Sequence, residues 1–428
     1  MDLRLQPSEL ERGASADGVL KDHCRRVAAV AAEVARSLEL PDHLHGVLER
    51  AALLHHSYDL GSRALARLAF AVSAAVETEV RVEETVTCEL ATVLALVLGE
   101  HAPSRTESLQ VLAGIVRMCH MLDDQIVGLP LDPRGIDAVL EELEGFASFE
   151  GFDPALVRPL RRLRVDSARL AGGGLRLPVQ AQSAQRVFRA LGRDQEYEMD
   201  ELAHLAERDP VLGGALIQVA NSALYSPERR VSTIRQAIVF VGCEAAREVM
   251  LATALRPLFA SAGLVRLWAH SVHVAQLTSA LAGDTGLLDP QEGLLMGLVH
   301  DIGALAAETL PRDAVVAWYR ITEKGCPPTY AEQLVLGRDH GEIGADILLE
   351  WNFPEHLIGA IRYHHQPERS ESALSSVLYL AEFWSGLDED LPSYVRLEEC
   401  TRRTGISLEG LACARVRRSA LSILPSVA

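Results

Sequence analysis

The chain has 428 residues, of which 48% are hydrophobic and 23% charged, and its net charge at pH 7 is −18. This length allows two or three domains with a large core. The acidic balance argues against broad binding to nucleic acid or to anionic membranes.

The seven cysteines are scattered and contain no C-x-x-C pair. They predict reduced thiols rather than a zinc finger or a disulfide framework. We find no signal peptide at the start of the chain and no apolar run of about 20 residues. These features together predict a cytoplasmic protein without a membrane segment.

Apolar residues follow helical spacing along most of the chain, and few stretches alternate with the period of two that is typical of strands. They crowd one side of a predicted helix over 27–38, and they form a stripe over 211–220. Thr329 to Glu332 has the pattern of a capping box and predicts the start of the helix that leads to His340. The sequence predicts an all-α fold built from multi-helical bundles.

The run Gly172-Gly173-Gly174 is the clearest domain boundary, because each glycine inside a helix costs about 1 kcal/mol relative to alanine. We therefore divide the chain near residues 150–176. The predicted parts are a tail over 1–20, a helical domain over 21–150, a linker over 151–176, a second domain over 177–395 with lobes over 177–260 and 261–395, and C-terminal helices over 396–428.

The two halves of the chain resemble each other faintly. The paired positions are His23 with His270, His55 with His300, and Asp123-Asp124 with Glu382, and the first half also carries His101. Self-similarity of this kind indicates duplication of one helical unit. Chance similarity between helices rich in alanine and leucine is the alternative.

An ordered series of histidines and carboxylates lies late in the chain. Its members are His270, His273, His300, Asp301, His340, His364, His365 and Glu382. Imidazole and carboxylate are common ligands of divalent transition metals, and facing helices of a bundle can each donate one or two of them. The series predicts a site for one or two ions of Fe, Mn or Zn. Such an ion lowers the pKa of the water bound to it to about 7. The resulting hydroxide is a nucleophile for phosphoester cleavage.

The alternative is that these histidines do not converge, since a single helix-borne histidine is usually structural or exposed. Five other histidines are predicted to be of that kind: His43, His45, His120, His204 and His356.

Several segments resemble the HD superfamily of metal-dependent phosphohydrolases: LWAHSVHVA, GLLMGLVHDIGAL, DHGEIGADILLEWNFP, AIRYHH and VLYLAEFW. The segment upstream resembles the HDOD domain of bacterial signalling proteins. It carries Asp209-Pro210, the tripeptide Ala220-Asn221-Ser222 and Tyr225. The resemblance covers about residues 177–395.

The resemblance implies a two-lobed helical domain that acts as a signalling output or scaffold module. It places a ligand set where the HD-GYP phosphodiesterases bind metal: His270, His300, Asp301, His340, His364 and His365, with Glu382 in place of their last aspartate. Two features depart from that branch. Ala304 stands where it has a lysine, and the Gly-Tyr-Pro loop is missing.

The remaining assignments are less specific. Asp209 and Asn221 are candidate ligand-binding residues, although helix capping explains both. In the first half, residues 21–130 resemble an HD-type lobe in which His-Asp has become His55-His56. Because an anionic ligand is then lost, this half is predicted to be a non-catalytic relative.

We expect a bacterial regulatory protein that binds a protein partner or a nucleotide second messenger without catalysis. The alternative is a metal-dependent phosphohydrolase acting on a nucleotide or cyclic dinucleotide, with Asp301 as its catalytic residue. A third hypothesis is a sensor that keeps the metal or ligand pocket only for binding.

Overall fold

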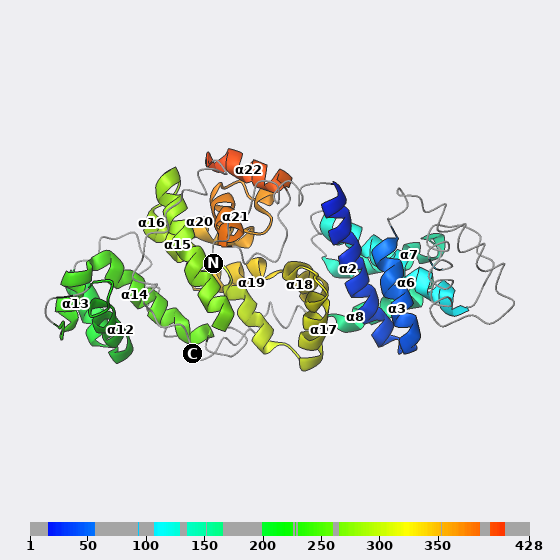
Figure 1. The fold of residues 1–428 in the computed structure, drawn as a ribbon, viewed down its shortest axis with the longest axis horizontal. Coiled ribbons are helices and arrows are strands. Elements are labelled where there is room, and N and C mark those ends of the chain that lie inside the picture. The colour runs from blue at the N-terminus through cyan, green and yellow to red at the C-terminus, as the bar shows by residue number, and fades with distance from the viewer. Residues whose placement is uncertain are drawn as a thin grey trace. The chain divides into compact units, whose positions relative to one another are not determined.

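The computed structural model describes residues 16–55, 93, 107–128, 135–150, 152–165, 199–225, 227, 230–259, 265–351, 353–385 and 394–406. Every element within these ranges is an α-helix or a 3-10 helix, so the predicted all-α fold is confirmed (Figure 1). None of the described helices is long and apolar enough to cross a membrane. The chain forms two compact units, which are taken separately below.

The first unit comprises Met1–Ala168 and Leu310–Asp339. Its elements are α2 (Ala16–Ser37), α3 (Asp42–Leu54), α6 (Glu107–Gly128), α7 (Ile136–Glu150), η2 (Pro154–Val157), α8 (Arg158–Leu163), α17 (Arg312–Glu323) and α18 (Pro328–Leu336). Helix α2 contacts both α3 and α6. It is rich in alanine, which favours helix, and Ala28, Ala31 and Ala35 are buried, so neighbouring helices can approach it closely.

Helices α17 and α18 belong to the core of the first unit. Ile321, Tyr330 and Leu334 are buried among residues of α2, α3 and α6. On the rim, Arg320 lies 3.4 Å from Glu33. The sequence-based domain division had included this segment in the lobe over 261–395. The division near 151–176 stays a prediction, because most of that linker lies outside the described residues.

The second unit comprises Arg169–Thr309 and His340–Ala428. Its elements are α11 (Met199–Glu207), α12 (Pro210–Ala220), α13 (Ile234–Val241), α14 (Cys243–Leu255), η3 (Arg256–Phe259), α15 (Val265–Thr285), α16 (Pro290–Val299), η4 (Ile302–Thr309), α19 (His340–Glu350), α20 (Glu355–Arg362), η5 (Pro367–Arg369), α21 (Leu374–Ser385) and α22 (Tyr394–Thr404). Helix α15 packs against α16 and α21, and α19 packs against η4 and α20.

Two glycines let α16 approach α15 closely. A Cβ at Gly297 would lie 2.5 Å from the Cα of Ala275, and one at Gly293 would lie 2.8 Å from the Cβ of Ala282. The two glycines are four residues apart and therefore share one helix face. This close approach sets the distance between His270 of α15 and His300, which directly follows α16.

The predicted capping box at Thr329–Glu332 is wrong. Helix α18 already begins at Pro328, its N-cap is Pro327, and no side chain caps it. Proline fits the first turn of a helix because the amide hydrogen that it lacks would have no partner there. The helix also ends before His340, at Gly337, whose φ of 77° lies in the left-handed region. His340 instead begins α19.

Candidate metal centre

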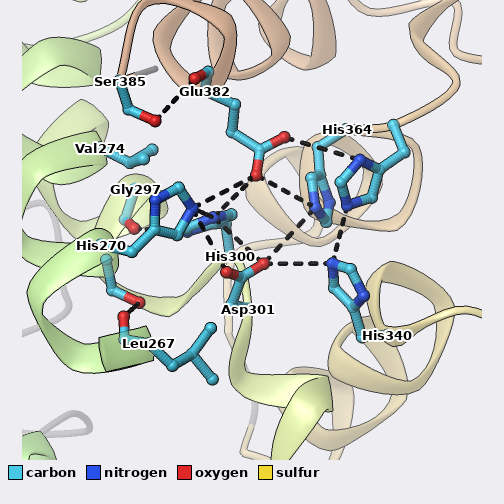
Figure 2. Close-up of polar contacts among 12 residues, drawn as sticks. Leu267, His270, Val274, Gly297, His300, Asp301, His340, His364, Glu382 and Ser385 are labelled. Carbon is cyan, nitrogen blue, oxygen red and sulfur yellow. Dashed lines mark hydrogen bonds and ion pairs between the residues drawn. The ribbon is translucent and has the colours of Figure 1, made fainter. Parts of the chain in front are cut away.

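The second unit brings together seven of the side chains that the sequence singled out. They are His270 from α15, His300 and Asp301 from the turn after α16, His340 from the start of α19, His364 and His365 from the turn after α20, and Glu382 from α21. In Figure 2, the carboxylates of Asp301 and Glu382 point toward the rings of His270, His300 and His364. The predicted convergence is therefore present.

The donor atoms form two groups that share one residue. The first group is His270, His300, Asp301 and Glu382, and the second is Asp301, His340, His364 and His365. Within each group all donor atoms lie within 4.8 Å of one another. Asp301 has two carboxylate oxygens and contributes to both groups, so it suits a ligand that bridges two ions.

Distances within the first group centre on the Nε2 atom of His300. This nitrogen lies 3.1 Å from Asp301 Oδ1, 3.0 Å from Glu382 Oε1 and 3.3 Å from Nε2 of His270. Ligands that share a metal at bonds of about 2.0–2.2 Å have separations of about 3–3.5 Å. The first group therefore has the spacing of a coordination shell.

Distances in the second group are more uneven. His340 Nε2 lies 3.2 Å from Asp301 Oδ1 and 2.7 Å from Nε2 of His365. His364 Nε2 lies 3.8 Å from the same aspartate oxygen. His340 and His364 thus face Asp301, the anionic member of this group, whereas Nδ1 of His365 lies 3.7 Å from Oε2 of Glu382.

Backbone carbonyl groups fix the orientation of two buried rings. Nδ1 of His300 lies 2.8 Å from the carbonyl oxygen of Gly297, and Nδ1 of His364 lies 2.6 Å from that of Ile361. A carbonyl oxygen only accepts hydrogen bonds, so Nδ1 carries the proton in both rings. Nε2 of each ring then points into the cluster, where it can bind a metal ion once it carries no proton.

Several buried atoms at the centre have no hydrogen-bond partner. They include Oδ1 of Asp301, Oε2 of Glu382 and Nε2 of His364. Buried polar atoms in proteins are nearly always satisfied, and exceptions often mark an ion or a water. The side chains of Asp301 and Glu382 are only 7% and 4% exposed, so bulk water does not satisfy them. These residues fit bound metal.

The histidines keep both carboxylates ionised. Burial raises the pKa of Asp301, but His300 and His340 outweigh burial and hold that pKa well below its usual value. Burial likewise raises the pKa of Glu382, and His365 and His364 outweigh it and lower that pKa. Burial lowers the pKa of His300, whereas Asp301 and Glu382 raise it to about 10. The centre thus offers two anionic ligands at neutral pH.

The two other candidate residues have local structural partners. Asp209 is the N-cap of α12 and accepts hydrogen bonds from the amides of Val211 and Leu212. Asn221 ends the same helix, where its Nδ2 donates to the carbonyl oxygens of Ile217 and Val231. Capping accounts for both side chains, and ligand binding at either stays a prediction.

The remaining histidines lie in varied places. His273 is half-buried, lies one turn after His270 and belongs to neither donor group. His43, His204 and His356 are exposed, and His45 lies 3.0 Å from the carbonyl oxygen of Leu40. His56 and His101 lie outside the described residues.

His120 is the residue that sequence reasoning missed. It was placed among the structural or surface histidines, but its ring contacts His23 and His55 in the first unit. The spacing His120-x-x-Asp123-Asp124 was the available signal, because residues three and four apart share a helix face. The half-repeat pointed to Asp123 and Asp124 but not to His120.

Parts of this chain resemble known proteins. An uncharacterized protein of Treponema pallidum is 24% identical over 207 residues, which are 46% of this chain and 40% of that protein. Ribonuclease Y of Deinococcus radiodurans is 28% identical over 147 residues, which are 33% of this chain and 21% of that enzyme. The chain thus matches two fifths or less of the length of these relatives.

A crystal structure of a Marinobacter aquaeolei VT8 protein named for signal transduction has the same fold. Its identity with this chain is 21%, the match covers 62% of each chain, and the TM-score is 0.50. The described part of the chain is an all-helical protein. Residues 177–367 match the family model of the HDOD domain, and this part of the chain is an HDOD domain.

Proposed function

We propose that the HDOD domain of this protein binds two divalent metal ions and hydrolyses a phosphoester of a nucleotide or cyclic dinucleotide. The observation that supports this most is the convergence of four imidazole-bearing segments on a shared aspartate, with buried donor atoms that lack partners. The match to part of a ribonuclease is consistent with phosphoester chemistry.

The chain's own residues have distinct roles in this proposal. His270, His300 and Glu382 would hold one ion, His340, His364 and His365 would hold the other, and Asp301 would be shared by both. Bound ions of this kind neutralise charge on the phosphoryl group and lower the pKa of water. The carbonyl groups of Gly297 and Ile361 keep two ligand rings oriented. Among these ligands, substitution of Asp301 should weaken metal binding most, because both ions would depend on it.

A second candidate function is binding without turnover, in which the metal-loaded domain recognises a nucleotide second messenger or a protein partner and regulates it. One observation favours it. Ala304 stands in η4, where the hydrolytic relatives that this sequence resembles carry a lysine. A phosphate ligand then lacks a cation at that position. The name of the Marinobacter protein is consistent with a regulatory role.

A cytoplasmic location belongs to either version of the proposal. The described cysteines Cys119, Cys243 and Cys400 are free thiols, which suits a reducing compartment.

The test uses the full chain stripped of metal and reloaded with Mn²⁺. Bound ions are counted by mass spectrometry, and turnover is measured on bis-p-nitrophenyl phosphate and on a panel of cyclic and linear dinucleotides. Asp301→Asn should lose both ions and lower turnover by at least about 100-fold. Asp284→Asn, an exposed aspartate of α15, is the matched control and should change neither.

Each outcome separates the candidates. Two bound ions with turnover that depends on Asp301 support the hydrolase. Two bound ions with no turnover on any substrate overturn the hydrolase and leave the binding function, which nucleotide-induced thermal stabilisation then tests. If no ion binds to the wild-type protein, both versions are wrong.

A further inference from the structure

Three histidines of the first unit meet at one point, each from a different helix. His23 lies on α2, His55 directly follows α3, and His120 lies on α6. His23 Nε2 is 3.2 Å from His55 Nε2 and 3.1 Å from His120 Nδ1, and the last two nitrogens are also 3.1 Å apart. The three atoms therefore form a nearly equilateral triangle.

The second nitrogen of every ring lies against an oxygen acceptor. These contacts are His23 Nδ1 to Asp123 Oδ2 at 2.7 Å, His55 Nδ1 to the carbonyl oxygen of Ala52 at 2.6 Å, and His120 Nε2 to Asp124 Oδ2 at 3.2 Å. A carbonyl or an ionised carboxylate cannot donate a proton, so each outer nitrogen carries one. The three inner nitrogens then present lone pairs to one another.

Three converging lone pairs repel one another, and a cation between them removes this repulsion. A single added proton lies along one N···N line and cannot serve three acceptors equally. A metal ion can, because tetrahedral bonds of about 2.0–2.1 Å to nitrogen give ligand separations of about 3.3–3.4 Å. The observed 3.1–3.2 Å is close to that edge length. Carboxylates and carbonyls behind the rings are the usual outer partners of histidine ligands.

The chemistry of this cluster differs from that of the second unit. There, Glu382 directs its carboxylate into the cluster. Here, Asp123 is held outside by Arg26, whose Nε and Nη2 donate to it at 2.8 and 2.9 Å, and His120 directs its ring inward. The inner set is therefore made of nitrogen alone, and Arg26 compensates the nearest carboxylate. Such a set selects a borderline ion that bonds to neutral imidazole, as Zn²⁺ does, over Mg²⁺ or Mn²⁺.

We propose that the first unit carries a separate mononuclear zinc site, formed by His23 Nε2, His55 Nε2 and His120 Nδ1. A fourth position is taken by water or by another group. His23 and His55 are buried, whereas the side chain of His120 is 31% exposed, so the ion is reached from the side of α6. The site does not depend on the proposed hydrolysis in the second unit.

The experiment isolates this site in the full chain. Asp301→Asn combined with His364→Ala disables the second unit as a metal site, and the purified protein is stripped and titrated with Co²⁺ and then Zn²⁺. One Co²⁺ should bind per chain with the intense visible absorption of tetrahedral coordination, and one Zn²⁺ should displace it. Adding His120→Ala should abolish this spectrum and weaken Zn²⁺ binding by at least about 100-fold. His43→Ala, an exposed histidine of α3, is the matched control.

Circular dichroism checks that each variant is folded, and the half-exposed position of His120 makes its removal mild. If the His120 variant is nevertheless unfolded, His120→Gln replaces it. The proposal is overturned if the protein lacking the second-unit ligands binds no Co²⁺, binds it with an octahedral spectrum, or keeps its tetrahedral spectrum without His120. The metal ligands of the second unit are substituted in every variant of this experiment. A negative result would therefore not contradict the hydrolase proposed for the second unit.

Discussion

At the scale of single residues, Asp301 has the environment that distinguishes this centre from a set of scattered histidines. It is buried, its Oδ1 has no hydrogen-bond partner, and it belongs to both donor groups. His300 and His340 oppose the cost of burying this carboxylate and hold its pKa well below its usual value. A bound metal pair would oppose that cost further and so stabilise the fold.

The division into two donor groups predicts how single substitutions change the metal count. His270→Ala removes a ligand of the first group only, and His365→Ala removes one of the second group only. Each variant should therefore retain about one of the two ions of the second unit, as counted by mass spectrometry after reloading with Mn²⁺ and dialysis. His204→Ala, an exposed histidine of α11, should retain both. Equal loss of both ions in either variant would contradict the two-group arrangement.

Glu248 of α14 provides a prediction on pH and stability. Burial, assisted by Glu244 and opposed by Arg247, raises its pKa from 4.5 to about 7. A carboxyl whose pKa is raised on folding stabilises the protein fully below its unfolded pKa, and this stabilisation is lost as the pH rises through the folded pKa. The wild-type protein should therefore lose this contribution between about pH 4.5 and pH 7.

Glu248→Gln keeps the side chain neutral at every pH. The melting temperatures of this variant and the wild type should agree near pH 4.5 and separate by several degrees at pH 8, equivalent to about 1–3 kcal/mol in favour of the variant. Glu201→Gln, at an exposed glutamate of α11, should show no such trend. A constant difference across this pH range would refute the assignment to Glu248.

At the scale of elements, one glycine contact holds Asp301 beside His340. A Cβ at Gly303 of η4 would lie 1.9 Å from the carbonyl oxygen of His340 and 2.5 Å from the amide nitrogen of Gly344. Both atoms belong to the backbone of α19, so they cannot rotate away as a side chain can. The backbone of η4 thus touches that of α19, and this contact brings the two ligands together.

Gly303→Ala should therefore separate η4 from α19. We expect a loss of about 3 kcal/mol or more in the free energy of unfolding, together with loss of metal binding in the second unit. Gly359→Ala in α20 is the control, because no atom lies within 4 Å of its added Cβ. It should stabilise the helix by about 0.5–1 kcal/mol and keep the metal. Denaturant titration and metal counting test both variants.

At the scale of the whole molecule, the first unit is built from two separate stretches of the chain, Met1–Ala168 and Leu310–Asp339. Helices α17 and α18 follow the HD motif in sequence and yet complete the core that begins with α2. Stability of the first unit therefore depends on residues that lie within the matched HDOD segment.

Leu334→Ala tests this arrangement. Leu334 is fully buried in the first unit, so its truncation should cost about 2–5 kcal/mol there. Hydrogen exchange should accelerate in α2 and α6 and stay unchanged in α15 and α16. Leu298→Ala, in the core of α16, should give the opposite pattern. Faster exchange in α15 but not in α2 after the Leu334 change would show that α18 belongs with the second unit.

The sequence by itself predicted the all-α class, the HDOD segment and all seven side chains of the second-unit cluster, because helical periodicity and ligand type are local properties of the chain. It did not predict the inward ring of His120, since periodicity cannot tell which face of α6 meets α2. It also missed the start of α18 at Pro328, where proline rather than a capping side chain begins the helix.

Only the tertiary structure decided which ligands meet and how they divide. Asp301 is the shared member because the glycine contact between η4 and α19 places it between two sets of rings. Likewise, Arg26 and His23 hold Asp123 outside the first-unit cluster, so the two similar halves present different donor sets. Coordination depends on separations of a few tenths of an ångström between distant segments, and those separations are set by helix packing rather than by spacing along the chain.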